Sequence, residues 1–243
     1  MCGRIVLNSP PGEIAVEFSL TALPELAPRY NIPPGGPVAA IMAGQGERDR
    51  VLRLLTWGLV SPDVRWRDTA PRLINARAET IARKAAFAES FARRRCLIPV
   101  NGFYEWKKTG GRAQPFLIHR RDGGLFALAG IWNRWEYPGG RILEACAIIT
   151  TEAADFMREI HRRMPVLIAA AQRELWLHGS ADDADAQVRS MVPEETGALT
   201  AHAVDPRVGD PAFDEPRCLE PWRPGHAGQL ALFGPQDEDE SHD

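Results

Sequence analysis

A cysteine stands directly behind the initiator methionine, in the opening stretch MCGRI. If Met1 is removed, as is usual before a small second residue, Cys2 carries an α-amine (pKa about 7.7–8.0) and a thiol (pKa about 8.5) on adjacent carbons. Such a 1,2-aminothiol captures aldehydes durably, because the amine forms an imine and the thiol closes on it to give a thiazolidine ring. Position 2 taken alone still favours the simpler interpretation, a small buried hydrophobic side chain.

Alternating polar residues in the stretch PRLINARAET form a second candidate site. Asn75, Arg77 and Glu79 are two residues apart, so on an extended segment their side chains share one face. The Asn could orient a ligand and the Arg could hold a phosphate, while a helix is predicted to begin around Glu79. The alternative is capping and turn chemistry by Asn75.

Two residues are candidates for proton transfer. Glu105 lies in GFYEW, where its aromatic neighbours would partly desolvate the carboxylate and raise its pKa towards the range needed for proton transfer. The alternative is a surface pair with Lys107, which shares its face on a strand. His161, in EIHRRMPVLI, titrates near neutral pH and could serve as acid or base, although a lone histidine is more often structural.

The composition is that of a globular protein. Of the 243 residues, 44% are apolar and 25% are charged, and no apolar run is long enough to cross a membrane or to form a signal peptide. We therefore expect a cytoplasmic protein with no membrane partner. The four cysteines and six histidines lack the spacing of zinc sites or of a disulfide framework, which predicts chemistry without a metal or cofactor.

Many short apolar segments are separated by Gly-rich turns, a pattern typical of antiparallel β-structure. The turns KKTGGR and RDGG are the best hairpin signals. Helical periodicity is limited to residues 78–95, 170–179 and 182–192. We therefore predict a mostly antiparallel, barrel-like sheet with a few helices. Strands are expected at residues 4–8, 37–43, 51–60, 95–106, 115–120, 125–132 and 144–150.

The chain changes character after about residue 221. Residues 223–243 are rich in Pro, Gly and acidic residues and are predicted to form a disordered tail, which leaves residues 2–222 as one domain. The tail contains GQLALFG, which resembles the short peptide by which bacterial repair proteins dock on the replication sliding clamp. The alternative is a last strand or a packing segment. The clamp-binding residues, within 229–233, would be Gln229, Leu230, Leu232 and Phe233.

Five motifs together resemble one family. In order and in spacing, the SOS response-associated peptidase (SRAP) family is matched by MCGR at the start, RYNIPPG at 29–35, LINARAET at 73–80, GFYEW at 102–106 and IHRRMPVLI at 160–168. The resemblance covers roughly residues 2–222. It implies a single α+β domain built on a curved antiparallel, barrel-like β-structure, with the mature N-terminal cysteine in a positively charged cleft. It also implies binding of single-stranded DNA and a thiazolidine cross-link to abasic sites that shields the lesion.

The resemblance also assigns roles to single residues. Cys2 is implied to be the nucleophile, and Asn75 to position the reacting centre. Glu105 is implied to shuttle protons at the amine and imine, and His161 to be the acid that opens the deoxyribose to its aldehyde. One departure is Asp210, which stands where the family usually carries Asn. The implied DNA contacts are Arg4, Arg77 and Arg163 on phosphates, Thr150 as a cleft hydroxyl, Trp66 as a stacking residue, and Asn31 and Pro34 at the rim.

Three functions are therefore compared. The first is DNA–protein cross-linking at abasic sites, for which a monomer suffices and which would make the protein nucleoid-associated when bound to DNA. The second is a cysteine peptidase in which Cys2, His161 and Glu105 form a nucleophile–base set, and whose only turnover could be removal of its own first residue. The third is a non-covalent single-stranded-DNA-binding module in which the cysteine is structural.

Overall fold

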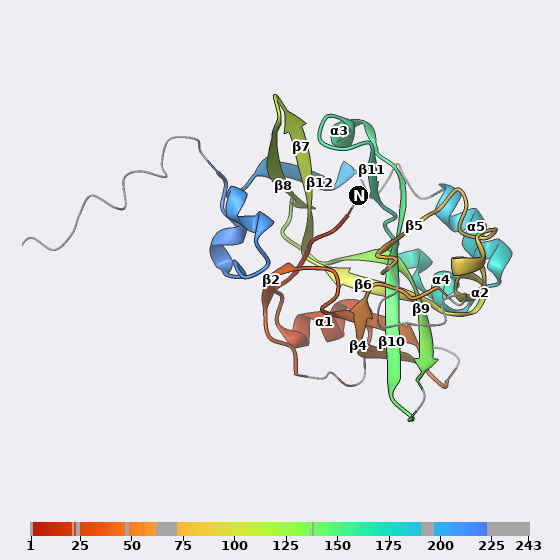
Figure 1. Ribbon diagram of the computed structural model, residues 1–243. Coiled ribbons are helices and arrows are strands. Elements are labelled where there is room, and N and C mark those ends of the chain that lie inside the picture. The colour runs from red at the N-terminus through yellow and green to blue at the C-terminus, as the bar shows by residue number, and fades with distance from the viewer. Residues whose placement is uncertain are drawn as a thin grey trace, which may run out of the picture.

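The computed structural model describes residues 2–20, 22, 25–46, 49–61, 72–137, 139–190 and 197–222. Its strands form two sheets, accompanied by a few short helices (Figure 1). The α+β class expected from the sequence is confirmed. Trp66, the predicted tail at 223–243 and its clamp-binding residues 229–233 lie outside the described residues. Within the described ranges, no helix is long and apolar enough to span a membrane.

The larger sheet closes into a barrel. Its ring consists of β10 (Ile142–Glu152), β4 (Arg50–Trp57), β3 (Pro37–Ala43), β6 (Arg95–Val100) and β9 (Phe126–Glu136), in that order. The ring is complete because β9 also pairs with β10. Every neighbouring pair is antiparallel except β10–β4, which is parallel with Ala145 opposite Thr56. A ring of five strands cannot alternate direction throughout, so closure itself requires a parallel pair, which the sequence pattern did not indicate.

Two short strands extend the barrel sheet along β10. β5 (Asn75–Arg77) runs parallel to it, with Arg77 opposite Thr150. β11 (Arg163–Pro165) runs antiparallel to it, with Pro165 opposite the same Thr150. The sequence motifs LINARAET and IHRRMPVLI, which are far apart in the chain, are therefore brought together by one strand.

The smaller sheet is antiparallel throughout. In spatial order its strands are β12 (Leu199–Ala203), β8 (Arg112–Arg120), β7 (Gly102–Thr109), β1 (Ile5–Leu7) and β2 (Arg29–Ile32). The hairpin predicted from KKTGGR is confirmed: Thr109 lies opposite Arg112, and Gly110 and Gly111 supply the positive φ angles of 56° and 81° in the turn. The RDGG segment is not a hairpin, because it carries the chain from β8 in this sheet to β9 in the barrel.

The strand predicted over residues 95–106 is divided between the two sheets. β6 and β7 are separated by Asn101, where the chain passes from the barrel to the smaller sheet. The Asn101 side chain accepts hydrogen bonds from the backbone N–H groups of Asn8 and Ser9 at 2.9 and 3.1 Å, which fixes this bend to the end of β1. As a result, Glu105 on β7 belongs to the smaller sheet.

Three helices lie together beside the barrel in Figure 1: α2 (Ala85–Arg93), α4 (Arg173–His178) and α5 (Ala181–Ser190). The remaining helices are α1 (Pro11–Phe18) and α3 (Asp155–Arg158). The helices predicted over 170–179 and 182–192 are confirmed over their described residues, the first beginning with a 3₁₀ turn, η1 (Ala170–Gln172).

The helix predicted to begin around Glu79 begins later, at Ala85, and the prediction of its start is wrong. Residues 78–83 form turns instead. The Ala78 N–H group donates to Thr150 O at 2.9 Å, which continues the β5–β10 pairing beyond β5. Glu79 forms an ion pair with Arg163 on β11. These contacts with distant strands outweigh the local preference of the segment for a helix.

The chain after β12 folds back over the smaller sheet. Residues 204–222, the C-terminal arm, contain two 3₁₀ turns, η2 (Pro206–Gly209) and η3 (Pro216–Leu219). η3 packs on β2 and η2 packs on β8 (Figure 1, blue). The sequence did not indicate this packing. Val6, Tyr104, Leu117, Val204, Val208 and Cys218 form a second small core beneath the arm.

The packing inside the barrel requires glycine at position 130 on β9. A Cβ atom at Gly130 would lie 2.8 Å from Cys96 Sγ and 3.2 Å from Ile98 Cγ1. Gly130→Ala is therefore expected to lower the free energy of unfolding by about 1–3 kcal/mol through overpacking, measured by urea denaturation. Cys96→Ala in the same chain removes the nearest atom and should recover part of the loss. Equal stability of Gly130→Ala and the wild type would contradict this clash.

Candidate active site

The predicted catalytic residues meet where the two sheets face each other. Cys2 lies just before β1 and Glu105 lies on β7, both in the smaller sheet, whereas Asn75 lies on β5 in the barrel sheet. His161 stands just before β11, and Figure 1 places the N-terminal end of the chain beside that strand. A direct contact joins the two sheets here, because Asn75 Nδ2 donates to the carbonyl oxygen of Cys2 at 2.8 Å.

The Cys2 side chain is fully buried, as the simpler interpretation of the sequence expected. Burial raises the pKa of its thiol far above the ordinary value, and the negative charge of Glu105 raises it further. The positive charge of the amino terminus and a hydrogen bond with the Arg4 backbone lower this pKa, but by less. The thiol is therefore held in its protonated form beside a carboxylate, and its reaction as a nucleophile needs a proton acceptor.

Glu105 and His161 lie next to each other, as catalytic roles for both would require. Glu105 is 2% exposed, and His161 Nδ1 lies 3.9 Å from Glu105 Oε1. The same Nδ1 atom lies 2.9 Å from Arg163 N and 3.0 Å from Arg163 O, so it accepts from the first in one tautomer of the neutral ring and donates to the second in the other. The alternative of a Glu105–Lys107 surface pair is wrong, because Glu105 is buried and Lys107 Nζ lies 3.7 Å from Glu159 Oε2.

Asn75 holds the backbone of Cys2, and the alternative that it caps a helix is wrong because it lies within β5. Its Oδ1 atom is buried and has no hydrogen-bond partner among the described residues. Buried polar atoms normally have a partner, so this oxygen is an acceptor available to a bound group. Among the residues that the structure describes, no cluster of three or more His, Cys, Asp or Glu side chains could hold a metal ion.

Arg163 is engaged by protein groups on two sides. Its Nη1 and Nη2 atoms donate to the two carboxylate oxygens of Glu79 at 2.7 and 3.0 Å. Nη2 also donates to Thr150 O at 2.5 Å and lies 3.3 Å from the buried Thr150 Oγ1. Partial burial, the largest single effect, acts to raise the pKa of Glu79, but the hydrogen bonds and charge of Arg163, a backbone hydrogen bond and the charge of Arg77 together lower that pKa. A phosphate at Arg163 would therefore compete with Glu79, a pairing that sequence reasoning missed.

The other two arginines implied to contact phosphates differ in exposure. Arg77 is exposed on β5. Arg4 is buried, and its guanidinium donates to Asn31 Oδ1 at 2.7 Å and to the carbonyl oxygens of Val208 and Gly209 at 2.8 and 2.7 Å. Nη1 and Nη2 of Arg4 are thus directed into the protein, towards Asn31 and the C-terminal arm, and its phosphate contact stays a prediction from the resemblance.

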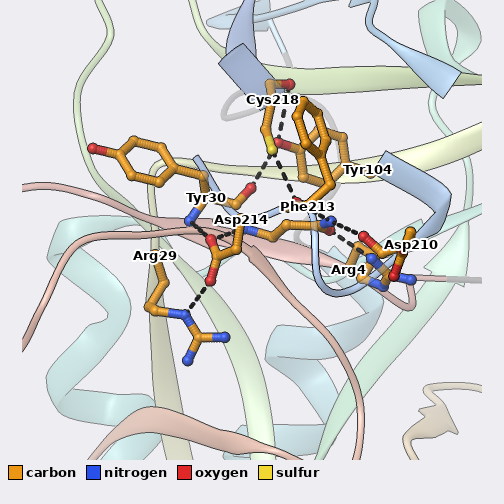
Figure 2. Close-up of polar contacts among 9 residues, drawn as sticks. Arg4, Arg29, Tyr30, Tyr104, Asp210, Phe213, Asp214 and Cys218 are labelled. Atoms are coloured by element: carbon orange, nitrogen blue, oxygen red, sulfur yellow. Dashed lines mark hydrogen bonds and ion pairs between the residues drawn. The ribbon is translucent and has the colours of Figure 1, made fainter. Parts of the chain in front are cut away.

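Asn31 and Pro34 were expected at a DNA-binding rim. Asn31 is fully buried instead, and its Nδ2 lies 3.1, 3.0 and 2.8 Å from the carbonyl oxygens of Val208, Asp210 and Phe213. It supports the arm from beneath, and Figure 2 shows Arg4 next to Asp210 of the arm. Pro34 is half-buried in the turn between β2 and β3.

A family described as SOS response associated peptidase (SRAP) matches residues 1–211 of the chain. Among curated proteins, the chain is 34% identical over 224 residues to the abasic site processing protein YoqW of Bacillus subtilis, a match that covers 90% of this chain and 99% of that protein. It is 30% identical over 230 residues to the abasic site processing protein YedK of Escherichia coli, which covers 91% and 100%.

A solved structure of a protein from Bacteroides thetaiotaomicron has the same fold. The two chains superpose with a TM-score of 0.80 at 23% sequence identity, over 91% of this chain and 100% of that one. A phage-related protein from Bordetella bronchiseptica superposes with a TM-score of 0.67 at 28% identity, over 84% of this chain and 94% of that one.

Proposed function

Because the chain belongs to the SOS response associated peptidase (SRAP) family, we propose that it processes abasic sites in single-stranded DNA by forming a thiazolidine between Cys2 and the deoxyribose aldehyde. The observation that carries this proposal is the environment of Cys2. Its backbone is held by Asn75, its buried thiol feels the charge of Glu105, and the imidazole of His161 lies beside that carboxylate. The relatives YoqW and YedK, both abasic site processing proteins by name, support the choice of substrate.

The reaction balances without an oxidant or another co-reactant. In the closed sugar, the C1′–O4′ bond breaks as the C1′ hydroxyl loses its proton and O4′ gains one, which gives the aldehyde. The amine of Cys2 then adds to C1′ and water leaves, which forms the imine. Finally the sulfur bonds to C1′ and the thiol proton passes to the nitrogen. Aldehyde and aminothiol thus give thiazolidine and one water.

Each neighbouring group has a step that suits its position. His161, which lies beside Glu105, supplies the proton that O4′ needs when the sugar opens. Because the pKa of the Cys2 thiol is raised, the reaction needs a proton acceptor. Glu105 accepts the thiol proton and returns it to the nitrogen. Asn75 fixes the backbone of the nucleophile and offers Oδ1 to the amine or the sugar.

Affinity for DNA would come from phosphate contacts, because an abasic site has no base to read. Arg77→Ala is expected to weaken binding of an intact single-stranded oligonucleotide and to reduce the slope of log K against log salt by about 0.7, the value of one phosphate contact on a single strand. Fluorescence anisotropy at several salt concentrations measures both. Arg134→Ala, which removes an exposed arginine on β9, is the control. An unchanged slope for Arg77→Ala would argue against its phosphate contact.

A denaturing gel tests the proposed function directly. Purified protein is mixed with a single-stranded oligonucleotide that contains an abasic site, and with an intact oligonucleotide of the same sequence. A slower band with the abasic oligonucleotide alone supports cross-linking, and no such band would refute it. Binding to both oligonucleotides without a covalent band would favour the non-covalent module, and cleavage of an unrelated peptide would favour the peptidase. Docking of residues 229–233 on a sliding clamp stays a prediction from the sequence.

A further inference from the structure

The C-terminal arm contacts the residues around the proposed nucleophile. We propose that the arm is a positioning element for Cys2. Asp214 and Asn31 dock the arm on β2, and Arg4 links the docked arm to the backbone next to Cys2. The importance of Cys2 rests on the proposed function, whereas the mechanical coupling can be tested without DNA. Asp214, Asn31 and Arg4 together are called the arm latch.

Asp214 closes the free edge of the smaller sheet. Its Oδ1 atom accepts hydrogen bonds from the backbone N–H groups of Tyr30 and Asn31 at 2.6 and 2.9 Å, and its Oδ2 atom pairs with Arg29 (Figure 2). β2 is the last strand in the order of this sheet, so the carboxylate takes the place of a further strand. Hydrogen bonds to an ionised carboxylate are stronger than those between neutral groups, which makes Asp214 the strongest attachment of the arm to β2.

Asn31 serves the arm and Arg4 with the same side chain. Its Nδ2 atom contacts three arm carbonyl oxygens, and its Oδ1 atom accepts from Arg4 Nη1 at 2.7 Å. An Asn amide has two N–H donors and one carbonyl oxygen, so both of its ends are used while the arm is docked. Because Asn31 is fully buried, movement of the arm would leave buried polar groups without partners, which is unfavourable.

Arg4 connects this network to Cys2. Its side chain binds two arm carbonyl groups, while its backbone bonds the Cys2 thiol group. The Arg4 carbonyl oxygen also accepts from Tyr104 N at 3.0 Å, which ties it to the strand that carries Glu105. If the arm left, the buried guanidinium would lose its two arm carbonyl partners and move towards water, because a buried charge with too few partners is costly. The backbone next to Cys2 would then lose its support.

The chain contains its own reporters for this coupling. Cys218 is buried in the arm, and its carbonyl oxygen lies 3.2 Å from the Tyr104 hydroxyl group, which lies 2.8 Å from the carbonyl oxygen of Tyr30 (Figure 2). Cys96 and Cys146 are fully buried in the barrel, away from the arm. Asp214 and Cys218 lie just beyond residue 211, where the family match ends.

The test is the rate of alkylation of each cysteine by iodoacetamide, read by mass spectrometry on the DNA-free protein. Asp214→Ala is expected to speed modification of both Cys218 and Cys2 by about tenfold, equivalent to 1.4 kcal/mol, and to leave Cys96 and Cys146 unchanged. Asp214→Asn is the matched control, because its amide oxygen can still accept from the two backbone N–H groups. It should have a much smaller effect.

Three outcomes would overturn the proposal. Faster modification of Cys218 alone would show that the arm leaves without disturbing Cys2, and no change at either would show that Asp214 does not dock the arm. If Asp214→Ala unfolds the chain, amide hydrogen exchange on the wild type is the deciding measurement. The backbone amides of Asn31 and Tyr104 should exchange with the same free energy of opening. Different free energies for the two amides would refute the coupling. None of these readouts uses DNA, so failure of the proposed cross-linking is recognised separately.

Discussion

Cys2→Ala is expected to abolish the adduct that survives denaturation. The variant keeps an N-terminal α-amine, so it can still form an imine with the aldehyde of an abasic site, but no sulfur is present to close the ring. The imine should hydrolyse when the protein is denatured. A denaturing gel should therefore show no shifted band for Cys2→Ala unless borohydride is added to reduce the imine, whereas the wild type should need no reductant.

The matched control keeps the thiol and removes the free amine. A protein that retains Met1, or that carries an N-terminal tag, still has Cys2 but has no free amine on its α-carbon. We expect it to form no adduct that survives denaturation without borohydride, because the Cys2 nitrogen is then an amide that cannot form the imine on which its thiol closes, and an imine of the preceding residue's amine hydrolyses. Without borohydride, a denaturation-resistant band from this protein would show that the Cys2 amine is not needed, and such a band from Cys2→Ala would show that another residue reacts.

Glu105→Gln is expected to slow cross-link formation at saturating DNA by about 10²- to 10⁴-fold, the usual contribution of a general acid–base group. Its dissociation constant for an intact oligonucleotide should stay the same, since a buried carboxylate does not contact phosphate. Single-turnover gels and anisotropy measure the two quantities. The result is informative because a purely electrostatic role predicts the opposite change.

The charge of Glu105 raises the pKa of the Cys2 thiol. Neutralising Glu105 should lower that thiol pKa and so increase the fraction of thiolate at any given pH below it. If Glu105 were only a nearby charge, the variant would cross-link faster than the wild type, and a faster or equal rate would thus reject the proton-transfer role. Glu79→Gln, which neutralises a carboxylate bound to Arg163 rather than one facing the thiol, is the control.

The sequence predicted the site well where a residue type has a local signature. Glu105 between two aromatic residues and His161 before a proline-containing strand were candidates from their neighbours, and the family resemblance gave both a catalytic role. The structure places the two side chains 3.9 Å apart. Buried strands with strong β propensity were also recognised, because their pattern is local. The start of α2 was not, since the Ala78 bond to Thr150 joins residues far apart in the chain.

The arm latch had no signature in the sequence. Arg4 and Asn31 bind carbonyl oxygens of Val208 and Gly209 or their neighbours, at a separation of more than 170 residues. Backbone acceptors are present at every residue, so no residue type marks where such a bond will form. The resemblance implied a phosphate contact for Arg4, whereas the contacts that the structure gives for its guanidinium are with Asn31 and the arm.

The distance along the chain between Arg4 and its arm partners also determines when, during translation, the segment around Cys2 can reach its folded position. The Arg4–Val208 contact spans 204 residues, so the segment around Cys2 cannot be locked until nearly all of the chain has left the ribosome. At about 5–20 residues per second, translation leaves this segment accessible for about 10–40 s. An aminopeptidase that must reach Met1 before Cys2 is buried has that interval in which to act. A chain that folded its N-terminus earlier would risk burying Cys2 with Met1 still attached.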